Sequence, residues 1–376
     1  VMSERFESAA CEAGLTYNDD YNGQAQDGVG PPQVTQRKGM RWSAKRAYLS
    51  EKRSNLTTVT RAEVQHIVIE GKRAVGVVYK RGDNKVEVRA RQEVILSAGA
   101  LASPKLLMLS GIGPAADLKE HGIEVIIDAP DVGANLMDHP NANMSWDVKP
   151  RTYNVEVRSW RAPFHALNWL FRRRGPLTSP YPHAVAFIKS SPELESPDVQ
   201  LMFGPFAFAF STEGVVPYKH PAVTVVATLN YPKARGRLKL SSASASAPTV
   251  IEHELLGEDE DIRRLTNACR FVRTIFERPA LDEDVIGERL PGPAIDSDGD
   301  WSNYLRTSTF LGYHPCGTCA MGPKGVVDER LRVRGIESLR VVDASIMPSP
   351  ISGNTNAATI MIGERAADLI IEDSKR

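Results

Sequence analysis

The stretch from Glu93 to Gly113 constrains the fold more than any other part of the chain, because it joins a strand pattern directly to a helix with marked ends. Residues 93–97 form a short apolar run that is typical of a buried strand. Ser103 suits the N-cap of a helix, Pro104 its first position, and Gly111 the position after its last turn. A strand that leads at once into a helix is typical of α/β proteins, so we expect this class of fold.

Upstream of this junction, three strand patterns are separated by two short turns. Val64–Glu70, Ala74–Lys80 and Lys85–Ala90 are rich in β-branched residues, and the turns contain Gly71 and Gly82. We therefore predict a β-meander that leads into the strand at 93–97. Further helices are expected at Ser3–Ala13, Pro114–His121, Glu258–Phe276 and Asn356–Ile371, and further strands at Ala222–Leu229, Arg237–Ser241 and Leu339–Val342.

Composition indicates an ordinary globular protein of two or three domains. Of the 376 residues, 42% are hydrophobic and 24% charged, which excludes a disordered chain or a fibrous repeat. Basic and acidic residues both number 46, so no global field attracts nucleic acid or an anionic membrane. We interpret local basic runs such as Phe171–Arg174 as solvated faces. No window approaches the ~20 apolar residues of a membrane span, and no signal peptide is visible. The location is left open, with a cytoplasmic one favoured because the chain does not begin like a complete protein.

Four cysteines in a chain of this length do not indicate a disulfide framework. Cys316 and Cys319 form a CxxC pair, which in other proteins can be a redox dithiol or half of a zinc site. A structural zinc site needs a second such pair or a nearby pair of histidines, and neither occurs in the sequence. We therefore predict no metal.

Five motifs together indicate a family. The segment Gly99–Gly113 begins with small residues, continues with Ser-Pro and paired aliphatics, and ends with Ser-Gly-Ile-Gly. It resembles the second signature of the glucose-methanol-choline (GMC) oxidoreductases. Val132–His139 resembles the next landmark of that family, and His314–Gly322, Val342–Pro348 and Gly353–Asn356 resemble its C-terminal catalytic end. The resemblance implies an FAD enzyme that oxidises an alcohol to an aldehyde or ketone by hydride transfer to flavin N5.

The resemblance also places the two catalytic candidates, His314 and Asn354. A base must take the hydroxyl proton as the carbon loses its hydride, and a neutral imidazole with a pKa of about 6.5 can do this near neutral pH. His314 matches the family's catalytic histidine. Asn354 matches a position that is His or Asn in the family, where an amide can donate to the substrate oxygen and orient it. From the residues alone, Asn354 or Asn356 could simply cap the last helix, and both roles can coexist.

A noncovalent FAD site is expected around three segments that relatives bring together. The turn at 97–103, Asp343-Ala344 and the start of the last helix should surround one flavin, with the helix N–H groups beside the N1–C2=O edge. In relatives, the backbone at the position of Val64 meets the adenine. The expected cofactor-binding residues are Val64, Ser97, Ala98, Gly99, Asp343, Ala344, Asn356 and Ala357.

The expected domains follow from the same resemblance. Residues 1–140 should form the remainder of an FAD-binding domain, 141–310 an α+β substrate domain, and 311–376 the return to the FAD-binding domain. The family begins with a strand, a GxGxxG turn and an acidic residue about twenty positions later. Because this pattern is not found, we expect a GMC-type α/β fold that lacks its N-terminal Rossmann βαβ unit. We also expect a partner, an N-terminal segment of the same protein that carries the GxGxxG turn.

Other functions and the substrate are left open by the sequence. A hydroxynitrile lyase of the same fold and a non-catalytic fragment acting as a binding module are the alternatives, while His314 argues against a photodecarboxylase. The partners should be a small alcohol and oxygen or another electron acceptor, and not nucleic acid. An apolar or aromatic alcohol is suggested by Phe203, Phe206, Phe208, Phe210 and Tyr313, although such aromatics are more often plain core. Small polyols and choline-like amino alcohols are the alternatives, and no carboxylate can be placed beside the site to favour a cation.

Overall fold

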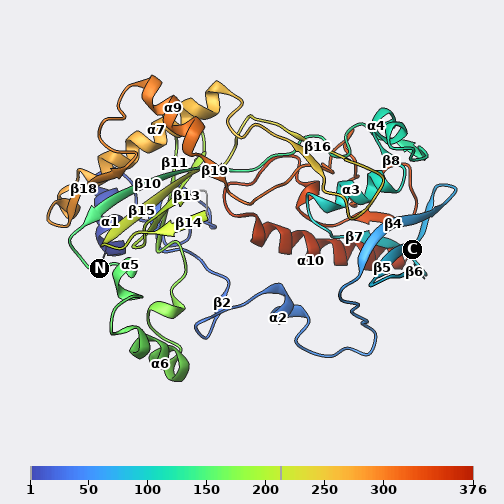
Figure 1. Ribbon diagram of the computed structural model, residues 1–376, viewed down its shortest axis with the longest axis horizontal. Coiled ribbons are helices and arrows are strands. Elements are labelled where there is room, and N and C mark those ends of the chain that lie inside the picture. The colour runs from blue at the N-terminus through green and yellow to red at the C-terminus, as the bar shows by residue number, and fades with distance from the viewer. Residues whose placement is uncertain (1, 212–213, 376) are drawn as a thin grey trace. The chain divides into compact units, whose positions relative to one another are not determined.

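A computed structural model describes residues 2–211 and 214–375. The chain forms two compact units, each assembled from three separate segments (Figure 1). Unit 1 comprises residues 1–51, 140–231 and 258–310, and unit 2 comprises residues 52–139, 232–257 and 311–376. What each unit contributes to function stays a prediction.

Unit 1 is built on an antiparallel sheet whose central strands are covered on both faces. Every residue of β11, β12 and β15 is buried, and these strands are mainly apolar, with Gln200, Thr224 and Thr228 as buried polar exceptions. The strand order is β1-β11-β12-β15-β10-β18, with β19 paired to β10. The strands are β1 (Gly28–Gly30), β10 (Pro140–Val148), β11 (Ala184–Ile188), β12 (Val199–Gly204), β15 (Ala222–Leu229), β18 (Val285–Leu290) and β19 (Phe310–Leu311).

One long amphipathic helix covers this sheet (Figure 1). α7 (Asp259–Phe276) buries residues at helical spacing, including Ile262, Leu265 and Val272, and its first turn carries three acidic residues that favour the helix dipole. At its end the ring of Phe276 stacks on Trp146 of β10 with centroids 3.7 Å apart. The other helices and hairpins of unit 1 are α1 (Met2–Glu12), β2 (Gln36–Arg37), β3 (Met40–Arg41), α2 (Ala44–Tyr48), α5 (Tyr153–Glu156), α6 (Ala162–Arg172), η1 (Pro176–Thr178), β13 (Phe208–Ser211), β14 (Gly214–Pro217), α8 (Pro279–Asp282) and α9 (Asp298–Ser308).

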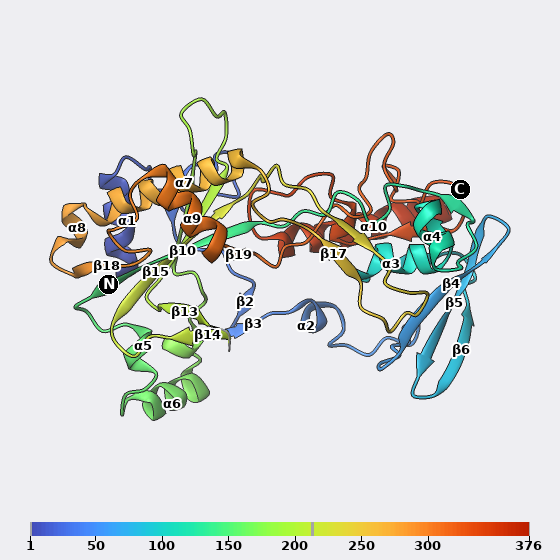
Figure 2. The same ribbon diagram turned by 45° about the horizontal axis from the view of Figure 1, so that its top comes forward.

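Unit 2 contains the predicted β-meander, whose strands are drawn in blue at the right of Figure 2. β4 (Glu63–Glu70), β5 (Arg73–Arg81) and β6 (Asn84–Arg89) form a three-stranded antiparallel sheet, as expected from the sequence. Gly71 and Gly82 both have positive φ at the turns, where glycine carries no steric penalty. The strand at the junction, β7 (Val94–Leu96), pairs in parallel with β20 (Leu339–Val341).

The helix after β7 confirms the predicted junction but begins earlier than expected. α3 (Ala102–Leu109) starts after Leu101, which makes no side-chain cap, so the prediction that Ser103 is the N-cap is wrong. The Ser103 hydroxyl instead bonds the carboxylate of Asp343. At the other end Gly111 has φ +83°, which confirms its predicted place after the helix.

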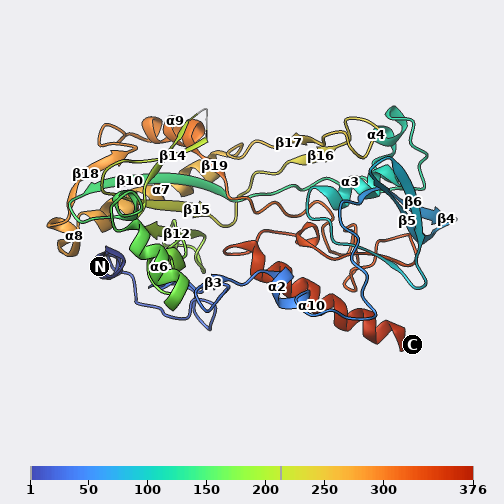
Figure 3. The same cartoon turned by 60° about the horizontal axis from the view of Figure 1, so that its bottom comes forward.

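The last helix packs along the core of unit 2, as Figure 3 shows from below. α10 (Thr355–Ser374) buries Ile362, Ala366 and Leu369, which are spaced by one turn and therefore face the core together. Its first turns contact η2 (Ala344–Ile346). The remaining elements of unit 2 are β8 (Ile112–Gly113), α4 (Ala115–Glu120), β9 (Ile127–Asp128), β16 (Arg237–Lys239) and β17 (Val250–Glu252).

Candidate active site

The backbone around His314 is held by one buried carboxylate. Oδ1 of Asp138 accepts hydrogen bonds from the backbone N–H of His139 at 2.7 Å and of His314 at 2.9 Å. Asp138 is only 6% exposed, and this burial raises its pKa, while the two backbone hydrogen bonds act in the opposite direction. Tyr313, between Gly312 and His314, adopts a positive φ of 58°, which is uncommon for an aromatic residue. The two histidines are thus fixed by chain segments far apart in sequence.

The side chains of His139, His314 and Asn354 form a hydrogen-bonded row. Nδ1 of His139 lies 3.0 Å from Nδ1 of His314, and Nε2 of His314 lies 3.1 Å from the amide nitrogen of Asn354. An amide nitrogen only donates, so Nε2 of His314 is the acceptor in that contact. A neutral His314 then carries its proton on Nδ1 and donates it to His139. The lone pair of Nε2 is therefore the basic atom of this row.

His314 is held in its neutral form. Burial lowers its pKa below the ordinary histidine value, because a desolvated imidazolium is less stable than a neutral ring. An imidazole that stays neutral near pH 7 can take up a proton from a bound hydroxyl group.

Asn354 occupies the N-cap position of α10, but its side chain makes no capping hydrogen bond. The amide is turned to His314, so the alternative that Asn354 only caps the helix does not describe its side chain. The first turn of α10 carries no acidic residue, and Asn356 and Ala357 within it are exposed. The N–H groups of this turn can therefore donate hydrogen bonds to the edge of a reduced flavin and stabilise its negative charge. This helix start fits the cofactor that the sequence implies.

Asp343 links the other two predicted cofactor segments. Its carboxylate accepts hydrogen bonds from the backbone N–H of Gly99 at 3.0 Å, from the hydroxyl of Ser103 at 2.5 Å and from the backbone N–H of Ser345 at 2.8 Å. The 97–103 turn is thereby tied to η2, which contacts α10. The structure brings the three predicted segments together. Ser97 and Ala98 are exposed, whereas Gly99 and Ala344 are half-buried.

The remaining predicted residues lie at several places. Val64 is half-buried on β4, next to a register shift in its pairing with β5. Tyr313 is 82% exposed in unit 2. In unit 1, Phe206 and Phe208 are half-buried with ring centroids 6.3 Å apart, and Phe203 is core, stacked on Phe6. The side chain of Phe210 lies outside the described part of the structure. Their role towards the substrate stays a prediction.

The sequence reasoning missed three residues of this site, namely Asp138, His139 and Gly312. Asp138 and His139 close the Val132–His139 landmark, and an acid followed by a histidine was the signal that could have identified them. Gly312 gives no sequence signal, because its role depends on close packing. A Cβ atom at Gly312 would lie 3.0 Å from both the carbonyl oxygen of His139 and Nδ1 of His314.

Gly312→Ala is expected to lower both stability and activity. The added methyl group must shift the His314 ring or the chain at His139, at a cost of about 1–3 kcal/mol in the free energy of unfolding. Flavin reduction by substrate should slow as His314 moves. Urea unfolding and stopped-flow reduction measure the two effects. Gly363→Ala in α10 is the control, since nothing lies within 4 Å of its Cβ and alanine favours a helix. Wild-type reduction rates in Gly312→Ala would show that the spacing of the rings is unimportant.

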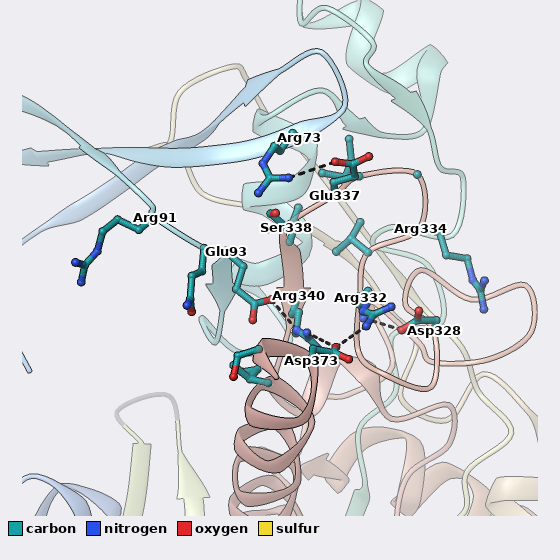
Figure 4. Close-up of a pocket in the computed structure, with 17 residues that line it drawn as sticks. Arg73, Arg91, Glu93, Asp328, Arg332, Arg334, Glu337, Ser338, Arg340 and Asp373 are labelled. Carbon is teal, nitrogen blue, oxygen red and sulfur yellow. Dashed lines mark hydrogen bonds and ion pairs between the residues drawn. The ribbon is translucent and has the colours of Figure 1, made fainter. Parts of the chain in front are cut away.

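A separate pocket of unit 2, about 760 Å³ in volume, is not a candidate for this chemistry (Figure 4). None of the candidate catalytic residues lines it. Its charges pair with each other: Arg340 donates to Glu93 at 2.6 Å and to Asp373 at 2.7 Å, and Arg332 also bonds Asp373. The shared pairing lowers the pKa of Asp373. These arginines stabilise the end of α10 and leave little positive charge for an anionic ligand.

The CxxC pair lies in the core of unit 2. Cys316 and Cys319 are free and fully buried, and burial raises the pKa of the Cys316 thiol to about 12 and that of Cys319 further. A thiol with a raised pKa forms little of the thiolate that redox exchange requires. Both cysteines are therefore packing residues in this structure.

Comparison with known proteins identifies the family. The N-terminal model of the GMC oxidoreductase family matches residues 1–141, and its C-terminal model matches residues 232–363. The chain is 41% identical to an alcohol dehydrogenase [acceptor] of Pseudomonas putida, over 98% of this chain and 68% of that protein. It is 39% identical to an oxygen-dependent choline dehydrogenase of Brucella anthropi, over 97% and 67% of the two chains. A formate oxidase of Aspergillus oryzae, solved in a study of its FAD modification, superposes with a TM-score of 0.91 at 28% identity, over 100% and 70% of the two chains.

These matches correct two predictions. We predicted only a C-terminal portion of the family, in a fold without its N-terminal Rossmann βαβ unit, and we predicted a separate N-terminal segment as partner. Both are wrong: the N-terminal family model matches residues 1–141, and the formate oxidase fold covers the whole chain, so the N-terminal FAD-binding unit is represented. The error came from treating a GxGxxG turn as the only marker of that unit. The meander, β7 and α3 also lie within the residues that the N-terminal family model matches.

The chemistry follows from family and site together. Its relatives include enzymes that act on CH–OH groups, and the cofactor of the family is FAD. The α10 helix start and the Asp343-linked turn fit that cofactor. The chain belongs to the GMC oxidoreductase family and is an FAD-dependent oxidoreductase that acts on alcohol groups.

Proposed function

We propose that this protein oxidises a small uncharged alcohol to an aldehyde or ketone, with His314 as the general base and Asn354 as the residue that orients the substrate oxygen. The observation that supports it best is the row His139–His314–Asn354, which leaves a neutral, basic Nε2 on His314 beside an amide donor. Bound FAD supplies the hydride acceptor at its N5.

The two residues have different tasks. Nε2 of His314 accepts the hydroxyl proton, and the imidazolium that forms still donates through Nδ1 to His139. The N–H of Asn354 turns from Nε2 to the substrate oxygen and holds it beside the base. His139 acts through His314 and not on the substrate, since its Nδ1 selects the tautomer of the catalytic ring. It is thus a positioning residue.

An uncharged alcohol is favoured over a quaternary ammonium alcohol such as choline. A cationic headgroup needs a carboxylate or an aromatic cage nearby. The carboxylate that contacts this site, Asp138, is buried and already accepts two backbone N–H groups. The exposed ring of Tyr313, next to His314 in the chain, suits an apolar or aromatic alcohol.

The proposal is tested by anaerobic reduction of the FAD-loaded enzyme with a panel of alcohols. Benzyl alcohol and a medium-chain primary alcohol are expected to bleach the flavin absorbance faster than choline at equal concentration. Reoxidation with oxygen and with an artificial acceptor then separates an oxidase from a dehydrogenase. Cleavage of a cyanohydrin without flavin bleaching by any alcohol would favour the lyase alternative, and faster reduction by choline would overturn the preference for an uncharged substrate.

A further inference from the structure

Helix α6 presents its apolar side to solvent, the reverse of an ordinary surface helix. Figures 1 and 2 show it projecting from unit 1 on the side away from α7 and α9. No residue of α6 is buried. Four large apolar side chains follow each other at spacings of four, three and four residues, so they lie on one face. Their exposed fractions are 73% for Trp160, 60% for Phe164, 50% for Leu167 and 77% for Phe171.

The face that α6 turns to the protein is held by polar contacts. Nε2 of His165 lies 2.8 Å from the carboxylate of Glu156, and the indole N–H of Trp169 donates to the carbonyl oxygen of Gly39 at 3.3 Å. The amide of Asn168 donates to the carbonyl oxygen of Arg174 at 3.0 Å, and Arg173 stacks over Trp169. The orientation of the helix is therefore set by specific bonds. The apolar face of α6 is therefore exposed to solvent.

The flanks of this face are strongly basic. Residues 157–174 contain five arginines and no acidic residue, although the whole chain carries no net charge. Among the described residues, Arg158, Arg172 and Arg174 make no ion pair. The hairpin β2–β3, which contacts α6 through Gly39, adds Arg37 and Lys38, both exposed. We call Val157–Arg174 the α6 patch.

We propose that the α6 patch binds the surface of an anionic lipid bilayer, with its aromatic side chains in the headgroup region and its arginines on the lipid phosphates. Tryptophan and phenylalanine beside basic residues are the composition of helices that lie in a membrane interface. Juxtaposed arginines are attracted by anionic headgroups. In the described residues no helix is long and apolar enough to cross a membrane.

Charge decides between the possible occupants of the patch. A second copy of the chain, docked face to face, would bring five more arginines against these five, and like charges oppose such a contact. A single-stranded nucleic acid could stack on Trp160 and Phe164, but it offers nothing to Leu167 and Leu170, which are 50% and 53% exposed. A bilayer satisfies both the aliphatic and the basic side chains.

The test is co-sedimentation of the FAD-loaded, full-length enzyme with vesicles. Wild type is expected to bind vesicles of phosphatidylcholine with phosphatidylglycerol, and to bind phosphatidylcholine alone much less. The variant Phe164→Ser/Leu167→Ser/Phe171→Ser should bind roughly 100-fold less, because it lacks three apolar side chains that the bilayer would bury. Its matched control replaces other exposed apolar residues, Val250→Ser/Ile251→Ser/Ile286→Ser, and should bind like wild type.

A second set of variants tests the charges without touching the apolar face. Arg158→Gln/Arg172→Gln/Arg174→Gln should lower binding to anionic vesicles by roughly 100-fold, since each basic side chain near such a surface contributes about fivefold. Arg81→Gln/Lys85→Gln on the β-meander should change nothing. Flavin absorbance verifies that each variant is folded. The proposal is overturned if wild type does not bind anionic vesicles. It is also overturned if the triple serine variant of the apolar face binds them as well as wild type does. Self-association or RNA binding through the patch without vesicle binding overturns it too.

Discussion

His314→Ala is expected to slow the reduction of the flavin by substrate by roughly 10²–10⁴ while FAD stays bound. The variant loses the atom that accepts the hydroxyl proton, so the alkoxide must form without a base. The segments predicted to hold FAD, the start of α10 and the Asp343-linked turn, keep their contacts, since within the described part of the chain the hydrogen bonds of His314 join it to Asp138, His139 and Asn354. Anaerobic stopped-flow absorbance measures the rate, and the flavin spectrum of the purified variant measures cofactor content.

Asn354→Ala is the matched comparison within the same row. It should cost less, about 1–3 kcal/mol of transition-state binding, because it removes one hydrogen bond to the substrate oxygen. Raising the pH should partly rescue His314→Ala, since a growing fraction of alkoxide needs no base, and should do little for Asn354→Ala. Near-wild-type reduction in His314→Ala would exclude it from the mechanism. Equal losses with the same pH dependence would mean that the two residues share one role.

The lowered pKa of His314 also determines the pH below which the wild-type rate of flavin reduction falls. Because the folded pKa lies below the ordinary value of 6.5, the ring stays neutral and active somewhat below that pH. Protonation of His314 removes the base and also lowers the free energy of unfolding, and this stability is lost as the pH falls through the pKa of the folded state. The reduction rate plotted against pH should therefore fall only below about pH 6.5. A limb centred above that value would contradict the burial of the ring.

Asp343→Asn is expected to lower the free energy of unfolding by about 2–4 kcal/mol and to weaken FAD binding. The carboxylate accepts three hydrogen bonds, from Gly99, Ser103 and Ser345. An amide has a single oxygen, and its NH₂ group would face a donor. The 97–103 turn then loses its tie to η2. Urea unfolding and flavin titration of the apoprotein measure the two effects.

Asp368→Asn on α10 is the control for that substitution. Its side chain is 69% exposed, and its one ion pair with the described residues is with Arg365, at 4.0 Å, so its removal should change stability by less than about 0.5 kcal/mol. An Asp343→Asn protein as stable as this control would show that the three bonds to the carboxylate contribute nothing.

Local patterns were enough for the parts of the fold where one segment decides its own structure. The meander strands have their turns at Gly71 and Gly82, and α3 ends before Gly111, as predicted. Ser103 shows where such reasoning stops. Its type suits an N-cap, but a buried carboxylate 240 residues away in sequence takes its hydroxyl, and a tertiary hydrogen bond outweighed the local preference.

The candidate site was predicted only in part, because several of its contacts join segments that are far apart in the sequence. His314 and Asn354 came from a motif resemblance, and the structure places them side by side. His139 closes the Val132–His139 landmark and could have been singled out there, but its contact with the His314 ring spans 175 residues, which a local pattern does not reveal. Gly312 depends on an absent side chain, which no sequence pattern reveals. The aromatic content near α6 was visible in the sequence, but which side of the helix faces outward depends on Glu156 and Gly39.

The interleaving of the two units has a consequence for how the protein is made. Each unit contains a segment from the last third of the described chain: residues 258–310 complete unit 1, and residues 311–376 complete unit 2. On the ribosome, the strands of the central sheet emerge long before α7 can cover them, and β7 emerges long before its neighbour β20. Such non-local pairing is slow, and the waiting strands expose apolar surface. Neither unit can therefore complete its core before its last segment has been synthesised.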